Sequence, residues 1–145
     1  MRILLPVDGS ENALEAVRHA LRLVDDGLRA SFVLANVQEP ASLYEMVVAH
    51  DAAVIEQVSE AAAQHVLAPA QALLRTAGLA FETEIANGDP GHQIVDIAER
   101  CNCELIILGA RGMEPLEGAL GSAAESVLRH ASMPVMVVRR DEQAA

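Results

Sequence analysis

The sequence predicts an α/β protein: an open, doubly wound sheet of five parallel strands with helices on both faces. Three observations predict this fold class. Apolar residues at helical spacing alternate along the chain with short, largely apolar runs, which is the pattern of βαβ units. Four of these runs are predicted strands: 3–7, which has the composition of a strand buried on both faces, 31–37, 104–108, which is apolar and central, and 134–138, a short apolar edge. The length of 145 residues, 52% of them hydrophobic, predicts a single domain over 1–145 with a polar tail at 139–145.

The first two elements are a strand at 3–7 and the helix that follows it. Asp8-Gly9-Ser10 ends the strand in a tight turn, and Ser10 is a favourable N-cap for the helix. Apolar residues then recur at helical spacing, at Leu14, Val17, Leu21 and Val24, until Asp25-Asp26-Gly27 ends the helix.

The middle of the chain predicts a strand at 31–37, a long helix over 41–77 and a strand at 79–86. The helix is expected to have a looser segment near 41–49 and a kink at Pro69, because proline cannot donate to the carbonyl one turn earlier. Glu82, Thr83 and Glu84 make the third strand polar, which indicates a strand at the edge of the sheet.

The last third of the chain predicts two helices and two strands. A turn at 87–91 leads into a helix over 91–101, and the strand at 104–108 leads into a glycine-rich loop over 109–121. Ser122 opens a helix to about 131, and the final strand is 134–138. Ligands of open parallel sheets bind beyond the carboxyl ends of the strands. Three segments reach such ends: 6–10, 35–39 and 109–122.

Charge and composition exclude several functions. Ten Arg, no Lys and 21 acidic residues give a formal net charge of −11, which disfavours a nucleic-acid partner. The absence of Lys excludes a P-loop lysine, a Schiff base and the lysine of a phospho-receiver domain. A bound anion must therefore be held by backbone N–H groups and helix dipoles.

The two cysteines, Cys101 and Cys103, are too close in sequence to favour a disulfide and are predicted to be free thiols of a cytoplasmic protein. The N-terminal residues lack the pattern of a signal peptide, and no apolar stretch approaches the roughly 18 residues that cross a bilayer. We therefore expect no membrane partner. The five histidines are scattered and no two have metal-ligand spacing, so none is predicted to bind a metal.

The loop at 109–121 is the strongest candidate for an anion site. Gly109, Gly112 and Gly121 allow the backbone to approach an anion closely, and the helix that begins at Ser122 presents unpaired N–H groups. Arg111 is the one cation of the loop and is within reach of a phosphate. The alternative is a plain connection from strand to helix, with Ser122 as its N-cap.

Two further strand ends have alternative interpretations. Asp8 is either a ligand for a divalent cation or a ribose hydroxyl, or an Asx-turn residue that supports Gly9-Ser10. Val37 either offers its backbone to a purine edge or simply ends its strand.

Taken together, these segments resemble the universal stress protein family along nearly the whole chain. The resemblance rests on RILLPVDGSENALEAV, FVLANVQEP, NGDPGHQIVDIA and ELIILGARG…LGSAAESVLRHASMPVMVVR. The family's nucleotide motif is Gly-x2-Gly-x9-Gly-(Ser/Thr), and Gly109, Gly112, Gly121 and Ser122 match it. Here eight residues rather than nine separate Gly112 from Gly121, and Ala124 replaces a hydroxyl common in nucleotide-binding members.

The resemblance implies the strand order 3-2-1-4-5 and a bound adenine nucleotide, ATP or else AMP or ADP, with Mg²⁺ held beside Asp8. It places Pro6, Val7 and Asp8 in the crevice and Val37 at the adenine. Glycines and neighbouring residues would surround the phosphates and ribose: Gly109, Gly112, Gly121, Ser122 and Ala123.

The family also implies a homodimer that pairs through the last strand, Pro134–Val138, since an exposed apolar edge favours pairing. The alternative is that the tail 139–145 covers that edge.

Three hypotheses follow for function. The first is a cytoplasmic dimer that senses ATP in the stress response and regulates unidentified partner proteins. The second is an interaction module that binds no nucleotide, and the third is a slow ATPase.

Overall fold

The computed structural model describes residues 1–39, 52–112 and 120–140, with the backbone alone over 52–58. Strands and helices alternate along the described chain. Their bounds are β1 (Arg2–Pro6), α1 (Glu11–Asp25), β2 (Ser31–Gln38), α3 (Ala52–Thr76), β3 (Phe81–Asn87), α4 (Pro90–Arg100), β4 (Leu105–Gly109), α5 (Ser122–His130) and β5 (Val135–Val138).

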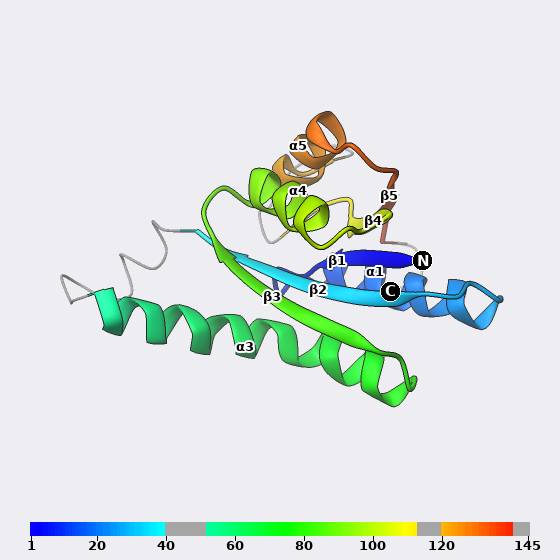
Figure 1. Ribbon diagram of the computed structural model, residues 1–145, viewed down its shortest axis with the longest axis horizontal. Helices are drawn as coiled ribbons and strands as arrows, with labels where there is room; N and C mark the ends of the chain where they lie inside the picture. Colours follow the sequence, from blue (N-terminus) through cyan, green and yellow to red (C-terminus); the bar gives the residue numbers. More distant parts are fainter. Residues whose placement is uncertain (40–51, 113–119, 141–145) are drawn as a thin grey trace.

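The strands form one five-stranded sheet in the order β3-β2-β1-β4-β5, and all its pairs are parallel. Helices α1 and α3 cover one face and α4 and α5 cover the other, as Figure 1 shows. The predicted fold class, an open doubly wound sheet, is therefore confirmed, as is the implied strand order. The order reverses at β1, whose connection through α1 leads to β2 on one side while β4 lies on the other.

Successive side chains of a strand point to opposite faces of the sheet, so the hydrophobic core has one part on each face. Ile3 and Leu5 of β1 are fully buried in the cluster formed with α1 and α3. Leu4, between them, is fully buried in the cluster formed with α4 and α5. Because both faces are covered, the central strands are apolar at consecutive positions, which explains the runs in the sequence.

Three helices begin at the same edge of the sheet, but their N-termini differ. Ser10 caps α1 by accepting a hydrogen bond from Ala13 N at 3.1 Å. Asp89 caps α4 by accepting from His92 N at 3.1 Å. The N-cap of α5 is Gly121, which supplies no side-chain acceptor. The interpretation of Ser122 as an N-cap is therefore wrong, because Ser122 is already the first helical residue.

The long helix predicted over 41–77 appears as α3, whose described part is Ala52–Thr76. The looser segment expected near 41–49 lies outside the described residues. Pro69 does not interrupt the helix, which Figure 1 shows as one continuous element. Pro69 is exposed, so its ring lies on the solvent side of α3.

The two edge strands are β3 and β5. The polar strand β3 is an edge strand as predicted, and Glu82 and Glu84 there form ion pairs with Arg2 and Arg100. Among the described helices, none has both the length and the apolar composition needed to cross a membrane.

Candidate functional site

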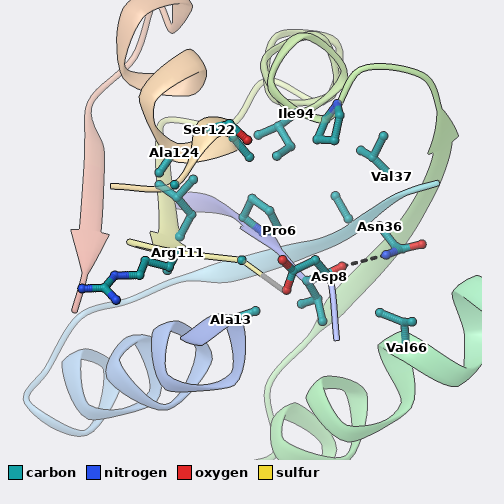
Figure 2. Close-up of a pocket in the computed structure, with 18 of the residues that line it drawn as sticks. Pro6, Asp8, Ala13, Asn36, Val37, Val66, Ile94, Arg111, Ser122 and Ala124 are labelled. Atoms are coloured by element: carbon teal, nitrogen blue, oxygen red, sulfur yellow. Dashed lines mark hydrogen bonds between the residues drawn. The ribbon is translucent and has the colours of Figure 1, made fainter. Parts of the chain in front are cut away.

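A cavity of about 430 Å³ lies beyond the carboxyl ends of β1, β2 and β4. Its volume falls in the usual range of small-molecule sites, about 300–1,000 Å³. Figure 2 shows its lining, which comes from both sides of the strand-order reversal. All the predicted site residues line it: Pro6, Val7, Asp8, Val37, Gly109, Arg111, Gly112, Gly121, Ser122 and Ala123.

The structure adds residues that the sequence analysis did not name individually as binding residues, four of them within the segment 35–39 that it expected at a strand end. These are Ala13, Ala35, Asn36, Gln38, Glu39, Val66, Pro90, Ile94, Leu108 and Ala124. Asn36 could have been recognised in the sequence, since it is a polar residue inside an otherwise apolar strand. Val66 and Ile94 could not, because only the packing of α3 and α4 brings their side chains to the strand ends.

Asn36 fixes the relative positions of β1 and β2 where the ladder between them ends. The last ladder bond runs from Val7 N to Ala35 O at 2.8 Å. Asn36 is buried, with 2% of its surface exposed, and its Nδ2 donates to Val7 O at 2.8 Å. Its Oδ1 accepts a hydrogen bond from Gln38 Nε2. This amide chain holds the end of β1 against β2 and so shapes the floor of the cavity.

Val37 pairs with Ala86 of β3 on one side, but on the other side the pairing of β2 with β1 ends at Ala35. In a parallel strand, the N–H and C=O groups of successive residues point alternately to the two sides. Ala35 O points to β1 and Gln38 O points to the β3 side, where it accepts from Gly88 N at 3.0 Å. Alternation therefore directs the N–H and C=O of Val37 to the β1 side. There β1 has already ended at Pro6, so one donor and one acceptor face the cavity.

Asp8 forms the turn with Ser10 that was one of its two predicted roles. Its Oδ1 accepts hydrogen bonds from both Ser10 N, at 2.9 Å, and Ser10 Oγ, at 2.5 Å. Its Oδ2 lies beside the loop, since a Cβ added to Gly112 would be 2.5 Å from that oxygen. Asp8 therefore holds the start of α1 with one carboxylate oxygen and directs the other toward the glycine-rich loop.

The loop glycines serve close approach rather than left-handed geometry, because none of Gly109, Gly112 and Gly121 has a positive φ. A Cβ at Gly109 would lie 2.7 Å from Asn12 O, so this glycine admits the backbone of α1. A Cβ at Gly121 would lie 3.3 Å from the Cα of Arg111. The two ends of the loop are joined by a hydrogen bond from Gly121 N to Ala110 O at 2.7 Å.

The start of α5 has the character of an anion site. Ser122, Ala123 and Ala124 line the cavity, and helix geometry leaves the N–H groups of this first turn without an intrahelical acceptor. The partial positive charge at a helix N-terminus adds to their attraction for a negative group. The Ser122 side chain is exposed at the same place.

The charged side chains of the cavity lining are few in the described residues: Asp8, Glu39 and Arg111. Figure 2 shows the Arg111 side chain directed away from Asp8 and Ser122. Within the described chain, no group of three or more His, Cys, Asp and Glu residues is arranged to hold a metal ion.

Both cysteines lie elsewhere, around the connection from α4 to β4, and both are free thiols as predicted. Burial raises the pKa of Cys103 to about 11. Burial also raises the pKa of Cys101, as does its contact with Glu84. Both thiols are therefore protonated at neutral pH and weakly nucleophilic.

Comparison with known proteins agrees with this architecture. The model of the universal stress protein family matches residues 1–139. The chain belongs to the universal stress protein family. A universal stress protein of Methanocaldococcus jannaschii is 29% identical over 143 residues, which cover 98% of this chain and 84% of that protein.

Solved structures of universal stress proteins share the fold. The universal stress protein UspA of Lactobacillus plantarum superimposes with a TM-score of 0.76 and 28% identity, covering 96% of this chain and 97% of its own. A family member from Arabidopsis thaliana with AMP bound gives 0.73 at 17% identity, covering 99% and 94%. A universal stress protein in complex with cAMP gives 0.69 at 22% identity, covering 96% of both chains. At these lower identities the last two establish the shared fold alone.

Proposed function

We propose that this universal stress protein binds an adenine nucleotide in the cavity and reports its occupancy to partner proteins in the stress response. The observation that carries the proposal is the N-terminus of α5. Of α1, α4 and α5, it is the helix whose N-cap has no side-chain acceptor, and its first turn lines the cavity. A phosphate there would accept from N–H groups that have no acceptor within the helix itself.

The backbone of Val37, on the side of β2 that faces the cavity, supports adenine as the base. Val37 offers one N–H and one C=O, and adenine offers a matching acceptor at N1 and donor at N6. Guanine reverses this pattern, because it has a donor at N1 and an acceptor at O6. The AMP and cAMP carried by two structural neighbours belong to the same ligand class.

The carboxylate of Asp8 is the proposed contact for Mg²⁺. Magnesium is commonly held by one or two carboxylates together with phosphate oxygens, and one oxygen of Asp8 is already engaged by Ser10. Oδ2, on the side of Gly112, is the remaining ligand atom. On this proposal Mg²⁺ strengthens the binding of ATP and ADP more than that of AMP, which has fewer phosphate oxygens to share.

Calorimetry with AMP, ADP, ATP and GMP, each with and without Mg²⁺, tests the proposal. We expect heat with the adenine nucleotides, a weaker signal with GMP, and loss of binding in the Gly121→Val variant, whose side chain would crowd Arg111 and the loop closure. Nucleotide carried through purification is a second measurement. The chain has no Trp and one Tyr, so absorbance at 260 nm after denaturation reports it cleanly.

Absence of heat with all three adenine nucleotides, together with no nucleotide released on denaturation, would overturn the proposal. That result would favour the interaction module that binds no nucleotide. If the protein releases phosphate from ATP and the Gly121→Val variant does not, the result would instead support the hypothesis of a slow ATPase.

We further propose that the active form is a homodimer in the cytoplasm. The outer edge of β5 carries backbone groups that no strand of the sheet pairs, and such an edge favours pairing with a second copy. The free thiols fit a reducing compartment. The alternative is that the tail 139–145 covers this edge, and residues 141–145 of that tail lie outside the described residues.

A further inference from the structure

Two histidines that are far apart in the sequence meet on the face of the protein formed by α4 and α5. His92 lies in the first turn of α4 and His130 is the last residue of α5. Their ring centroids are 5.0 Å apart and the ring planes are tilted by 35°. Both side chains are exposed.

Close packing of the two helices creates this pair. A Cβ on Gly91 would lie 2.2 Å from Ser126 Oγ, so only glycine lets α4 approach α5 this closely. His92 follows Gly91 in the chain, and His130 lies one turn after Ser126. The same contact that buries Gly91 therefore brings the two imidazoles together.

Hydrogen bonds fix the tautomer of both rings. His92 Nδ1 lies 2.7 Å from Asp89 Oδ2, and His130 Nδ1 lies 2.9 Å from Ser126 O. A carboxylate and a carbonyl oxygen accept but do not donate, so each Nδ1 carries the proton. In the neutral rings, each Nε2 therefore presents its lone pair.

This arrangement is the one that metal-binding histidines use. Their second ring nitrogen typically donates to a carboxylate or a backbone carbonyl, which orients the ring and raises the basicity of the ligating nitrogen. Asp89 supplies a carboxylate to His92 and Ser126 supplies a carbonyl to His130. Imidazole nitrogen suits zinc, copper and nickel.

The separation of the rings also fits a shared ion. With a metal–nitrogen distance of about 2.0–2.1 Å and about 1.2 Å from nitrogen to ring centre, each centroid lies about 3.2 Å from the metal. Two imidazoles bound at about 90–109° then have centroids about 4.6–5.3 Å apart. The observed 5.0 Å falls within that interval.

We propose that His92 and His130 bind one divalent transition-metal ion of the zinc and nickel class through their Nε2 atoms. Water completes the coordination, because two protein ligands leave positions open where structural zinc sites have four. The site is exchangeable and links the start of α4 to the end of α5. It is separate from the nucleotide cavity and does not depend on the function proposed for it.

Titration of the full chain with Zn²⁺ and with Ni²⁺, in the absence of nucleotide, tests this proposal. Competition with a colorimetric metal indicator gives affinity and stoichiometry. We expect one ion per chain, and at least a tenfold loss of affinity in both His92→Gln and His130→Gln. His65→Gln is the matched control, since it removes an exposed histidine of α3 and leaves the pair intact. Melting curves in a chelator should be the same for all three variants, because these side chains are exposed.

Binding that survives either single substitution would overturn the proposal, since it would place the ion on other groups such as the thiols or the N-terminal amine. Long-range proton–nitrogen NMR spectra of the imidazoles provide a second test in the metal-free protein. They should show both rings protonated at Nδ1, with both Nε2 resonances shifting on addition of Zn²⁺. Rings protonated at Nε2 would contradict the proposal. Nε2 resonances that do not shift on addition of Zn²⁺ would contradict it as well, because the two rings would then only be in contact.

Discussion

At the scale of single residues, the glycines of the nucleotide motif have different neighbours and therefore different roles, although they belong to one sequence pattern. The Cα of Gly109 faces the backbone of Asn12, which belongs to α1 and cannot move alone. The Cα of Gly112 faces the end of the Asp8 side chain, which can turn aside. One position therefore serves packing of the fold, and the other leaves room for a carboxylate in the cavity.

Substitution by alanine should separate these two roles. Gly109→Ala places a Cβ 2.7 Å from Asn12 O, so we expect a loss of about 1–3 kcal/mol in the free energy of unfolding, as for other overpacked sites. Gly112→Ala should leave stability within about 0.5 kcal/mol of the wild type and weaken nucleotide binding, because it displaces Asp8. Urea denaturation and calorimetry measure the two effects. Equal stability of both variants would show that α1 accommodates the extra methyl group.

The sequence predicted much of the site at this scale because strand ends and glycines are local signals. Asp8, Val37 and Gly121 follow from where strands stop and a helix starts. It left open whether Asp8 supports the turn at Ser10 or faces a ligand, because both interpretations fit the same residues. The meeting of His92 with His130 could not be found by spacing, since it depends on how closely α4 and α5 pack.

At the scale of secondary-structure elements, α4 shows how one side chain stabilises a helix start. Asp89 accepts from His92 N, while Pro90 occupies the first helical position, where a missing N–H costs nothing. Hydrogen bonds from the side chain and backbone of His92 lower the pKa of Asp89. A carboxyl group with a lowered folded-state pKa adds stability above its unfolded pKa, about 3.9, and that stability is lost as the pH falls through the lower folded value.

Replacing the cap should therefore have a pH-dependent effect. Asp89→Ala should reduce the free energy of unfolding by about 1 kcal/mol at pH 7, with the deficit shrinking below about pH 4. Most of this is the cap, because an exposed ion pair contributes little. Asp89→Asn keeps an acceptor and should remain within a few tenths of a kcal/mol of the wild type at pH 7. Denaturation from pH 3 to pH 7 checks both, and a deficit in Asp89→Ala that does not vary with pH would contradict the role of the charge.

The elements themselves were largely predictable because their signals are local and mutually consistent. Buried strands appear as apolar runs, and Ser10 and Gly27 mark the two ends of α1. The start of α5 was harder to place, because both Gly121 and Ser122 are acceptable N-caps. The strand order came from family resemblance, since parallel pairing between distant segments leaves no local trace.

At the scale of the whole molecule, the outer edge of β5 is the surface through which we propose that two copies of the chain pair. The carbonyls of Pro134 and Val138 point toward β4, where they accept from Ile106 N and Ala110 N. Alternation along the strand then directs the N–H groups of Val135 and Val137 outward. These are the donors through which a second copy would pair.

Val137→Pro should convert the proposed dimer to a monomer without unfolding it. Proline removes an outward N–H but no bond to β4, and edge strands tolerate it. Val137→Thr is the control, because it keeps both the N–H and a β-branched side chain. Light scattering after size exclusion gives the mass, and circular dichroism checks the fold. A dimer that persists in Val137→Pro would place the interface elsewhere, and a monomeric wild type would contradict the dimer itself.

The bond from Gly121 N to Ala110 O has a consequence for how this family can diversify. It anchors both roots of the intervening segment, so β4 and α5 keep their places whatever connects them. Loop-closure entropy changes slowly with length, by about 0.6 kcal/mol per doubling. The spacing in this chain, which is one residue shorter than in the family motif, is therefore expected to leave the scaffold unaltered. The length of this connection can thus vary between relatives without a large loss of stability.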